Sequence, residues 1–279
     1  MLNDEQRRHY AEHGYICLEN FKTRAQCEAL RAAANAIVEA FDADEHRAIF
    51  ATDDPKRSED AYFLSSGDKV RCFFEADAFD EAGRLKQAKA LSINKIGHAM
   101  HDLVPAFHTF SRGPKLADLV DALGVQDPKI WQSMYIFKQP RIGGEVRWHQ
   151  DATYFYTNPI SVVTLWFAID DATQQNGCLW AAKDGVDTPL RERFCVSDGH
   201  AELKTLTTAA WPTQHEAVPL EVEAGTLVCF NGLLPHYSAP NTSAKARHAY
   251  TLHVVDGRYH YPKTNWIQRA PEFPVSGFI

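Results

Sequence analysis

Residues Ser161–Ile169 read SVVTLWFAI, an apolar run of β-branched and aromatic side chains that is typical of a buried β-strand. The run Ile130–Lys138 (IWQSMYIFK) upstream alternates between apolar and polar residues, as a half-buried strand does. Asn176-Gly177 predicts a two-residue hairpin turn. Further strands are expected at Cys178–Ala182, Ala217–Val222, Thr226–Phe230 and Tyr250–Val255. Six or more short strands with polar connections predict an antiparallel barrel or a double-sheet jelly roll.

The first 125 residues or so are predicted to be mostly helical. Arg24–Phe41, capped by Thr23, repeats apolar residues at a spacing of three to four, which indicates an amphipathic helix. Other helices are expected at Asn3–His13, Ser92–Met100 and Lys115–Leu123, with a short strand at Tyr15–Leu18 and a turn-rich loop at Asp53–Gly67. Because no linker or repeat interrupts the chain, residues 1–279 are predicted to form a single domain, a helical elaboration (1–125) before a β core (126–279).

Composition and charge exclude several classes of protein. The chain has 279 residues, of which 45% are hydrophobic, and its net charge of −7 comes without a lysine- or arginine-rich block. These values argue against disorder, nucleic-acid binding and attachment to anionic membranes. No apolar run approaches the ~20 residues of a membrane span. Six scattered cysteines favour free thiols, and a polar N-terminus lacks the pattern of a secretory signal, so a cytoplasmic protein is expected. The oligomeric state is not indicated.

The segment Arg147–Asp151 reads RWHQD. In an extended backbone His149 and Asp151 point to the same face, where an imidazole and a carboxylate can occupy neighbouring positions on one metal ion. Alone the pattern is weak, because a strand-edge histidine beside an aspartate in a turn looks the same.

Two residues further along the chain strengthen the metal-site interpretation. His236 follows a proline in FNGLLPHYS, and Arg247 comes shortly after it, at the start of RHAYTLHVV. Two histidines and a carboxylate form the facial triad of non-haem Fe(II) oxygenases, and an arginine suits the carboxylate of a co-substrate. A closed zinc site would favour four protein ligands. His236 as a core or loop histidine and Arg247 as a solvated charge remain open alternatives.

Several blocks of the sequence have no generic reason to recur together. They are AYFLSSGDKVRCFFE (61–75), SINKIGHAM (92–100), QSMYIFKQP (132–140), GGEVRWHQDATYFYT (143–157) and DDATQQNGCLW (170–180). In these blocks, and from Tyr10 to Trp266 as a whole, the chain resembles the phytanoyl-CoA dioxygenase family. Within that family it most resembles the branch of phytanoyl-CoA dioxygenase domain-containing proteins. The resemblance implies a double-stranded β-helix, which is a cupin-like jelly roll, with N-terminal helices. It also implies Fe(II), 2-oxoglutarate and O2, with ascorbate in a supporting role.

The resemblance also implies a role for eight residues. His149, Asp151 and His236 would ligate iron, and Arg247, assisted by Ser238, would bind the distal carboxylate of 2-oxoglutarate. The remaining lining of that pocket would comprise Trp166, Met134 and Lys95. Core packing is the alternative for the tryptophan and the methionine, and a solvated helix position is the alternative for the lysine.

The implied reaction is hydroxylation of a C–H bond in a small molecule, with succinate and CO2 as co-products. Asp151 is present, which argues against halogenation, because related halogenases lack that carboxylate. A cupin-like protein that binds a metal or ligand without turnover, and a metal-dependent isomerase or hydrolase, are the competing hypotheses.

The segment Ala181–Pro189 departs from the family pattern at what would be the mouth of the site. The other histidines, His253 among them, are assigned no catalytic role, and the sequence does not identify the substrate.

Overall fold

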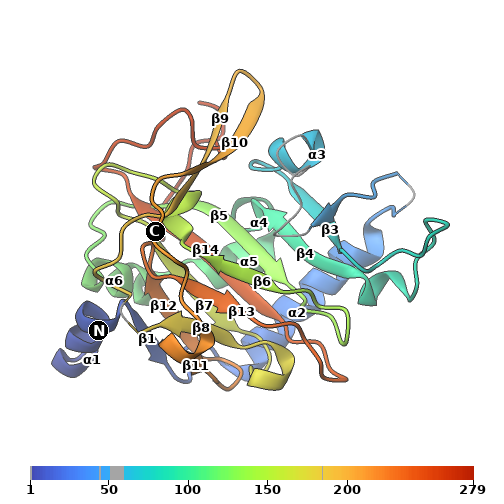
Figure 1. Ribbon diagram of the computed structural model, residues 1–279, viewed down its shortest axis with the longest axis horizontal. Coiled ribbons are helices and arrows are strands. Elements are labelled where there is room, and N and C mark those ends of the chain that lie inside the picture. The colour runs from blue at the N-terminus through green and yellow to red at the C-terminus, as the bar shows by residue number, and fades with distance from the viewer. Residues whose placement is uncertain (1, 44, 51–59, 184) are drawn as a thin grey trace.

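The computed structural model describes residues 2–43, 45–50, 60–183 and 185–279. Its largest element is an eight-stranded sheet, whose strands are β1 (Tyr15–Leu18), β12 (Leu227–Asn231), β7 (Val163–Ala168), β14 (Ala249–Asp256), β5 (Pro128–Ile136), β4 (Ile93–His98), β3 (Val70–Glu75) and β2 (Ile49–Phe50), in that order. A second sheet contains β11 (Ala217–Leu220), β8 (Leu179–Ala182), β13 (His236–Ser238) and β6 (Val146–His149). The hairpin of β9 (Glu192–Ser197) and β10 (His200–Thr205) projects from the body (Figure 1). These two packed sheets form the expected jelly roll.

The described residues form six helices, most of which pack on the outer face of the large sheet. They are α1 (Asp4–His13), α2 (Arg24–Ala40), α3 (Ala61–Leu64), α4 (Met100–Leu103), α5 (Pro105–Ser111) and α6 (Pro114–Ala122), with 3-10 turns η2 (Lys89–Leu91), η3 (Asp151–Thr153), η4 (Gln174–Asn176) and η5 (Gln214–Glu216). Capping boxes start both α1, at Asn3, and α2, at Thr23, and the second confirms the cap expected at Thr23. None of the described helices combines the length and apolarity needed to cross a bilayer.

Strand alternation divides the large sheet into two faces with different tasks. On β7, Leu165 and Phe167 pack with α2, α5 and α6 in the main core, and on β14 Leu252 does the same. The intervening residues, such as Thr164 and Trp166, point to the other side, toward the small sheet. The interior between the sheets is therefore supported by a helix-packed core behind it.

Most of the segment 92–100 forms a strand and not the expected helix, and only Met100 at its end is helical, as the first residue of α4. Ile93–His98 is β4, which pairs with β3 on one side and β5 on the other. The isoleucines at 93 and 96 and a glycine at 97 disfavour a helix, and pairing on both edges satisfies the backbone of this segment. Together with β1, β2 and β3, this strand shows that the first 125 residues contribute four strands of the main sheet besides their helices.

Two smaller expectations also need correction. Asn176-Gly177 does not form a hairpin turn, because β7 and β8 belong to different sheets and Gly177 ends the turn η4 with a φ of 81°. Within the loop expected at 53–67, residues 61–64 form α3, capped by the Asp60 side chain. Residues 53–59 of that loop lie outside the described part of the chain.

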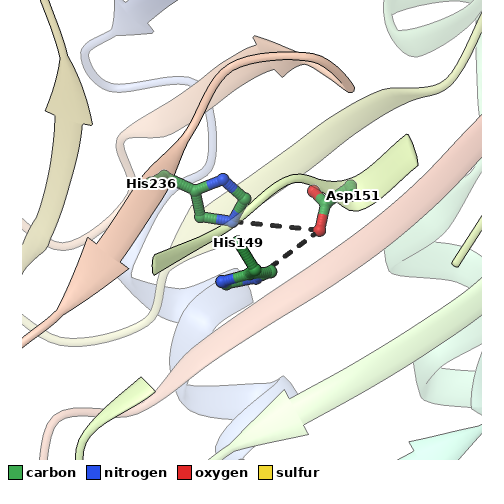
Figure 2. A group of neighbouring side chains, drawn as sticks. All are labelled: His149, Asp151 and His236. Atoms are coloured by element: carbon green, nitrogen blue, oxygen red, sulfur yellow. Dashed lines mark ion pairs between the residues drawn. The ribbon is translucent and has the colours of Figure 1, made fainter. Parts of the chain in front are cut away.

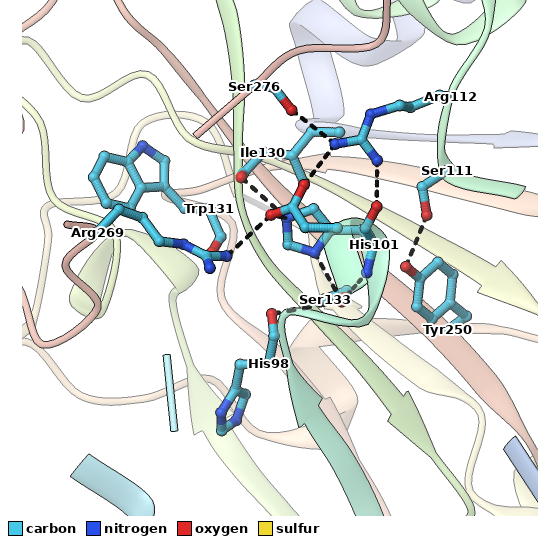
Figure 3. Close-up of polar contacts among 11 residues, drawn as sticks. His98, His101, Ser111, Arg112, Ile130, Trp131, Ser133, Tyr250, Arg269 and Ser276 are labelled. Atoms are coloured by element: carbon cyan, nitrogen blue, oxygen red, sulfur yellow. Dashed lines mark hydrogen bonds and ion pairs between the residues drawn. The ribbon is translucent and has the colours of Figure 1, made fainter. Parts of the chain in front are cut away.

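A buried polar cluster fastens the C-terminal segment to α4 and β5. Asp102 accepts from Arg112 at 2.6 Å, lies 3.3 Å from Arg269 Nη2 and lies 3.1 Å from His101 Nε2. Arg112 also donates to Ser276 Oγ at 2.7 Å (Figure 3). The segment held in this way carries Trp266, which reaches the space between the sheets.

The helix-packed face of β7 should dominate stability. Leu165→Ala removes a fully buried side chain and is expected to lower the free energy of unfolding by about 2–5 kcal/mol, measured by urea denaturation. Leu206→Ala, at a leucine that is 51% exposed, should change it by no more than about 0.5 kcal/mol. Equal effects of the two substitutions would contradict this assignment of the core.

Candidate metal centre

Pairing between β6 and β13 brings two distant histidines together. His149 on β6 lies opposite His236 on β13, and their ring centroids are 4.1 Å apart. Directly after β6 the chain enters η3, whose first residue is Asp151. Asp151 Oδ1 lies 3.7 Å from His149 Nε2 and 3.8 Å from His236 Nε2 (Figure 2).

Each imidazole is oriented by the carbonyl of the residue two positions earlier in the chain. His149 Nδ1 lies 2.8 Å from the carbonyl oxygen of Arg147, and His236 Nδ1 lies 3.0 Å from that of Leu234. A carbonyl only accepts, so each Nδ1 carries a proton and donates it. In a neutral ring this leaves the lone pair on Nε2, the nitrogen that faces Asp151, and such an outer hydrogen bond is usual for metal-binding histidines.

Burial adjusts the protonation of the cluster for metal binding. It lowers the pKa of His149 to about 3, with a further contribution from the nearby His236 ring. Burial raises the pKa of Asp151, but the surrounding imidazoles, led by His253, reverse this effect and hold it below its usual range. At neutral pH a neutral imidazole and a carboxylate therefore face one point.

These three side chains can hold one metal ion. One ligand atom from each lies within 4.8 Å of the others. Two imidazole nitrogens and one carboxylate oxygen on one side of an ion suit ferrous iron and leave half of an octahedron free for small ligands. The donor set therefore fits Fe(II).

A cavity of about 140 Å³ between the two sheets contains the cluster. All eight residues singled out from the sequence line it, namely Lys95, Met134, His149, Asp151, Trp166, His236, Ser238 and Arg247. Strands β4, β5, β6, β7, β13 and β14 or the segments flanking them supply these residues, so the fold gathers them from most of the chain.

The Arg247 side chain forms the cationic end of this cavity. It is 2% exposed, its Nη2 donates to Gly177 O at 3.0 Å, and its Nε and Nη1 have no partner among the described residues. Ser238 Oγ donates to the same carbonyl at 2.9 Å. Gly177 is needed here, because a Cβ would lie 2.5 Å from Ala239 O. Two unused donors on a buried guanidinium fit the carboxylate of 2-oxoglutarate.

A second buried cation lies beside Arg247. Lys138 Nζ donates to Gly144 O at 2.6 Å and lies 3.4 Å from Ser238 O. Burial, and after it the charge of Arg247, lowers the pKa of Lys138 to about 7, whereas burial lowers that of Arg247 only to about 10. The sequence analysis did not select Lys138, although it continues the alternation of cavity-facing positions on β5.

Lys95 is a buried strand residue and not a solvated helix lysine. Its Nζ lies 3.2 Å from the ring centroid of Phe50 and 3.7 Å from Met134 Sδ. Trp166 stands 5.3 Å from the Arg247 guanidinium, within range of a cation–π contact. Both lysine and tryptophan therefore contact other residues of the cavity wall.

Two further residues near the cluster were missed from the sequence. Thr164 donates its hydroxyl to Asp151 Oδ2, and His253 Nε2 lies 3.5 Å from the same oxygen. The strand β14 continues without a bulge as far as His253, so alternation does place this residue on the face of Arg247.

The aromatic residues beside the first ligands divide into two groups. Tyr154 and Phe155 line the cavity, whereas Trp148 stacks on Tyr237 with centroids 5.3 Å apart and does not. Trp266 adds a wall from the C-terminal segment. Among the described residues 181–183 and 185–189 none lines the cavity, so this part of the divergent segment does not form the expected mouth.

Comparison with solved structures matches the fold over nearly the whole chain. The carbocyclase SnoK from nogalamycin biosynthesis, described as non-haem and α-ketoglutarate dependent, superimposes with a TM-score of 0.65 and 17% identity, over 99% of this chain and 96% of its own. EctD from S. alaskensis, solved with 2-oxoglutarate and 5-hydroxyectoine, superimposes with a TM-score of 0.63 and 17% identity, over 98% of this chain and 83% of its own. A two-histidine, one-carboxylate cluster inside this jelly roll defines the class of non-haem Fe(II) enzymes.

Sequence relatives narrow the class to one family. A sequence model of the phytanoyl-CoA dioxygenase (PhyH) family matches residues 10–249. A phytanoyl-CoA dioxygenase of Arabidopsis thaliana is 41% identical over 96% of this chain and 94% of its own. A phytanoyl-CoA dioxygenase domain-containing protein 1 of Mus musculus is 40% identical over 98% of this chain and 97% of its own. The chain belongs to the phytanoyl-CoA dioxygenase family, and it is a non-haem Fe(II)- and 2-oxoglutarate-dependent oxygenase.

Metal binding should depend on the clustered carboxylate. Mn(II) at 100 times its dissociation constant should stabilise the wild-type protein by about 2.7 kcal/mol, and Asp151→Ala should abolish that gain. His200→Ala, at an exposed histidine on β10, should retain it. Thermal denaturation with and without Mn(II) measures the difference, and an undiminished gain in the aspartate variant would refute the site.

Proposed function

We propose that the protein hydroxylates a C–H bond of a small molecule, converting 2-oxoglutarate and O2 into succinate and CO2. The observation that carries this proposal is that one cavity contains both a group of metal-binding side chains and a buried cation. Three metal-binding side chains stand together, and the same cavity holds a buried guanidinium with two unused donors. A bidentate co-substrate with a distal carboxylate suits both features.

Each residue has a defined task in this proposal. His149, Asp151 and His236 would hold the ferrous ion, and Arg247 with Ser238 would bind the distal carboxylate of 2-oxoglutarate. Bound iron supplies the oxidising chemistry, and the chain binds, orients and excludes water. Trp166, Met134 and Lys95 would complete the wall of the co-substrate pocket. The carboxylate at 151 supports hydroxylation and not halogenation.

The proposed substrate is a small molecule with an apolar portion. Aromatic side chains at Phe63, Tyr154, Phe155 and Trp266 line the cavity beside the metal cluster. Apolar walls with few polar groups bind through burial of apolar surface and select by shape.

We propose a reducing compartment, the cytoplasm, as the site of action. All six cysteines are free thiols, and five of them are buried. Burial raises the pKa of several, including Cys72 and Cys178, each to about 12, so these thiols are poor nucleophiles.

Turnover without substrate tests the oxygenase function. Wild-type protein with Fe(II), ascorbate and 2-oxoglutarate is expected to release succinate slowly and to consume O2, and His236→Ala should abolish both. Succinate is measured by chromatography and O2 with an electrode. Metal and 2-oxoglutarate binding without succinate would favour the binding-only hypothesis. An activity that depends on neither O2 nor 2-oxoglutarate would favour an isomerase or hydrolase.

The arginine should control the affinity for the co-substrate. Arg247→Ala is expected to raise the KM for 2-oxoglutarate by one to two powers of ten, because a charge-assisted bidentate contact is worth about 2–3 kcal/mol. Arg247→Lys should recover part of the loss, since a point charge remains. An unchanged KM in steady-state assays of Arg247→Ala would mean that another residue binds the carboxylate.

A further inference from the structure

The two oxygens of the Asp151 carboxylate have different neighbours. Oδ1 faces the Nε2 atoms of His149 and His236, at 3.7 and 3.8 Å. Oδ2 accepts the hydroxyl of Thr164 and lies 3.5 Å from His253 Nε2. One oxygen is therefore directed to the metal position, and the other is bound by the protein.

Thr164 and His253 form a cross-strand pair. They stand directly opposite each other where β7 and β14 run antiparallel, and both point to the cavity. They are 1% and 3% exposed. The His253 ring also stacks on Phe155, with centroids 4.5 Å apart and an interplanar angle of 15°. Strand register and stacking thus place both side chains beside Oδ2.

The number of oxygens that bind the metal decides how many positions stay open. A carboxylate that binds through both oxygens takes two positions, and the triad then leaves two open instead of three. Chelation of 2-oxoglutarate uses two positions, and O2 needs another. Any contact that keeps Oδ2 away from the ion therefore keeps one more coordination position open for these co-substrates.

We propose that Thr164 and His253 are positioning residues that hold Asp151 to coordination through one oxygen and so keep a position free for the co-substrates. The proposal rests on the proposed function, because it takes Asp151 as a metal ligand. A purely structural role, in which the pair only satisfies a buried carboxylate, makes a different prediction. Loss of the pair would then weaken the whole cluster, including its hold on the metal.

Matched variants separate the two roles. Thr164→Val removes the hydroxyl at nearly constant volume, and Thr164→Ser keeps it. His253→Leu removes the ring donor, and His253→Gln keeps a side-chain N–H. Thr153→Val is the control, because Thr153 is buried next to Asp151 in η3, yet its hydroxyl contacts no described partner.

Binding is measured without turnover, using Mn(II) and anaerobic 2-oxoglutarate. In Thr164→Val and His253→Leu we expect Mn(II) affinity to stay within about threefold of wild type, while 2-oxoglutarate binds the Mn(II)-loaded protein about tenfold more weakly, the size of one hydrogen bond to a charged group. Electron paramagnetic resonance follows Mn(II), and calorimetry follows 2-oxoglutarate. Thr164→Ser, His253→Gln and Thr153→Val should all remain near wild type.

Two results would overturn the proposal. Equal weakening of Mn(II) and 2-oxoglutarate would indicate a structural role only, and unchanged binding of both in Thr164→Val and His253→Leu would show that the pair has no such role. Failure of the proposed function looks different, because the wild-type protein itself would then release no succinate from 2-oxoglutarate in the presence of Fe(II), ascorbate and O2, whatever the variants bind.

Discussion

Antiparallel pairing of β13 with β6 is the contact on which the arrangement of the metal centre depends. It sets His236 opposite His149, although a long stretch of chain separates the two. A slip of one residue would turn one imidazole to the opposite face of the sheet. Each ring then uses the carbonyl of the residue two positions earlier in the chain to fix Nδ1, so the orientation of both metal-facing nitrogens follows from the backbone in and just before the paired strands.

The cavity combines imidazole and carboxylate ligands with a buried cationic end. Burying Arg247 and Lys138 side by side costs stability, because both groups lose water and the charge of Arg247 disfavours the charged form of the lysine, and the lowered pKa values express that cost. A dianionic ligand would offset the penalty on binding. The arrangement is therefore understandable as a binding site, whereas a fold selected for stability alone would not need two buried cations next to each other.

Local patterns in the sequence predicted those features of the structure that depend on residues close together in the chain. The two-residue step from His149 to Asp151 and the strand-like run at 161–169 are properties of neighbours. The run forms β7, and the step does bring the two side chains together, although Asp151 begins η3 and does not continue the strand. The strand at 93–98 could not be recognised, because pairing with β3 and β5 decides it. The same limit applies to Thr164 and His253, whose proximity to Asp151 depends on a register between strands far apart in the chain. The strong hairpin signal at Asn176-Gly177 gave a wrong prediction, because the strands on either side of it, β7 and β8, join different sheets.

Strands β7 and β14 connect the stability of the fold to the geometry of the site. Leu165 and Leu252, both fully buried, pack on the helices from one face of these strands. Their neighbours Thr164 and His253 face Asp151 from the other face. A close-packed core resists displacement of the backbone, so it also fixes the two side chains that hold the carboxylate. The helices on the outer face thereby support the metal ligands without contacting them, which gives the N-terminal half of the chain a part in the site beyond the residues it contributes directly.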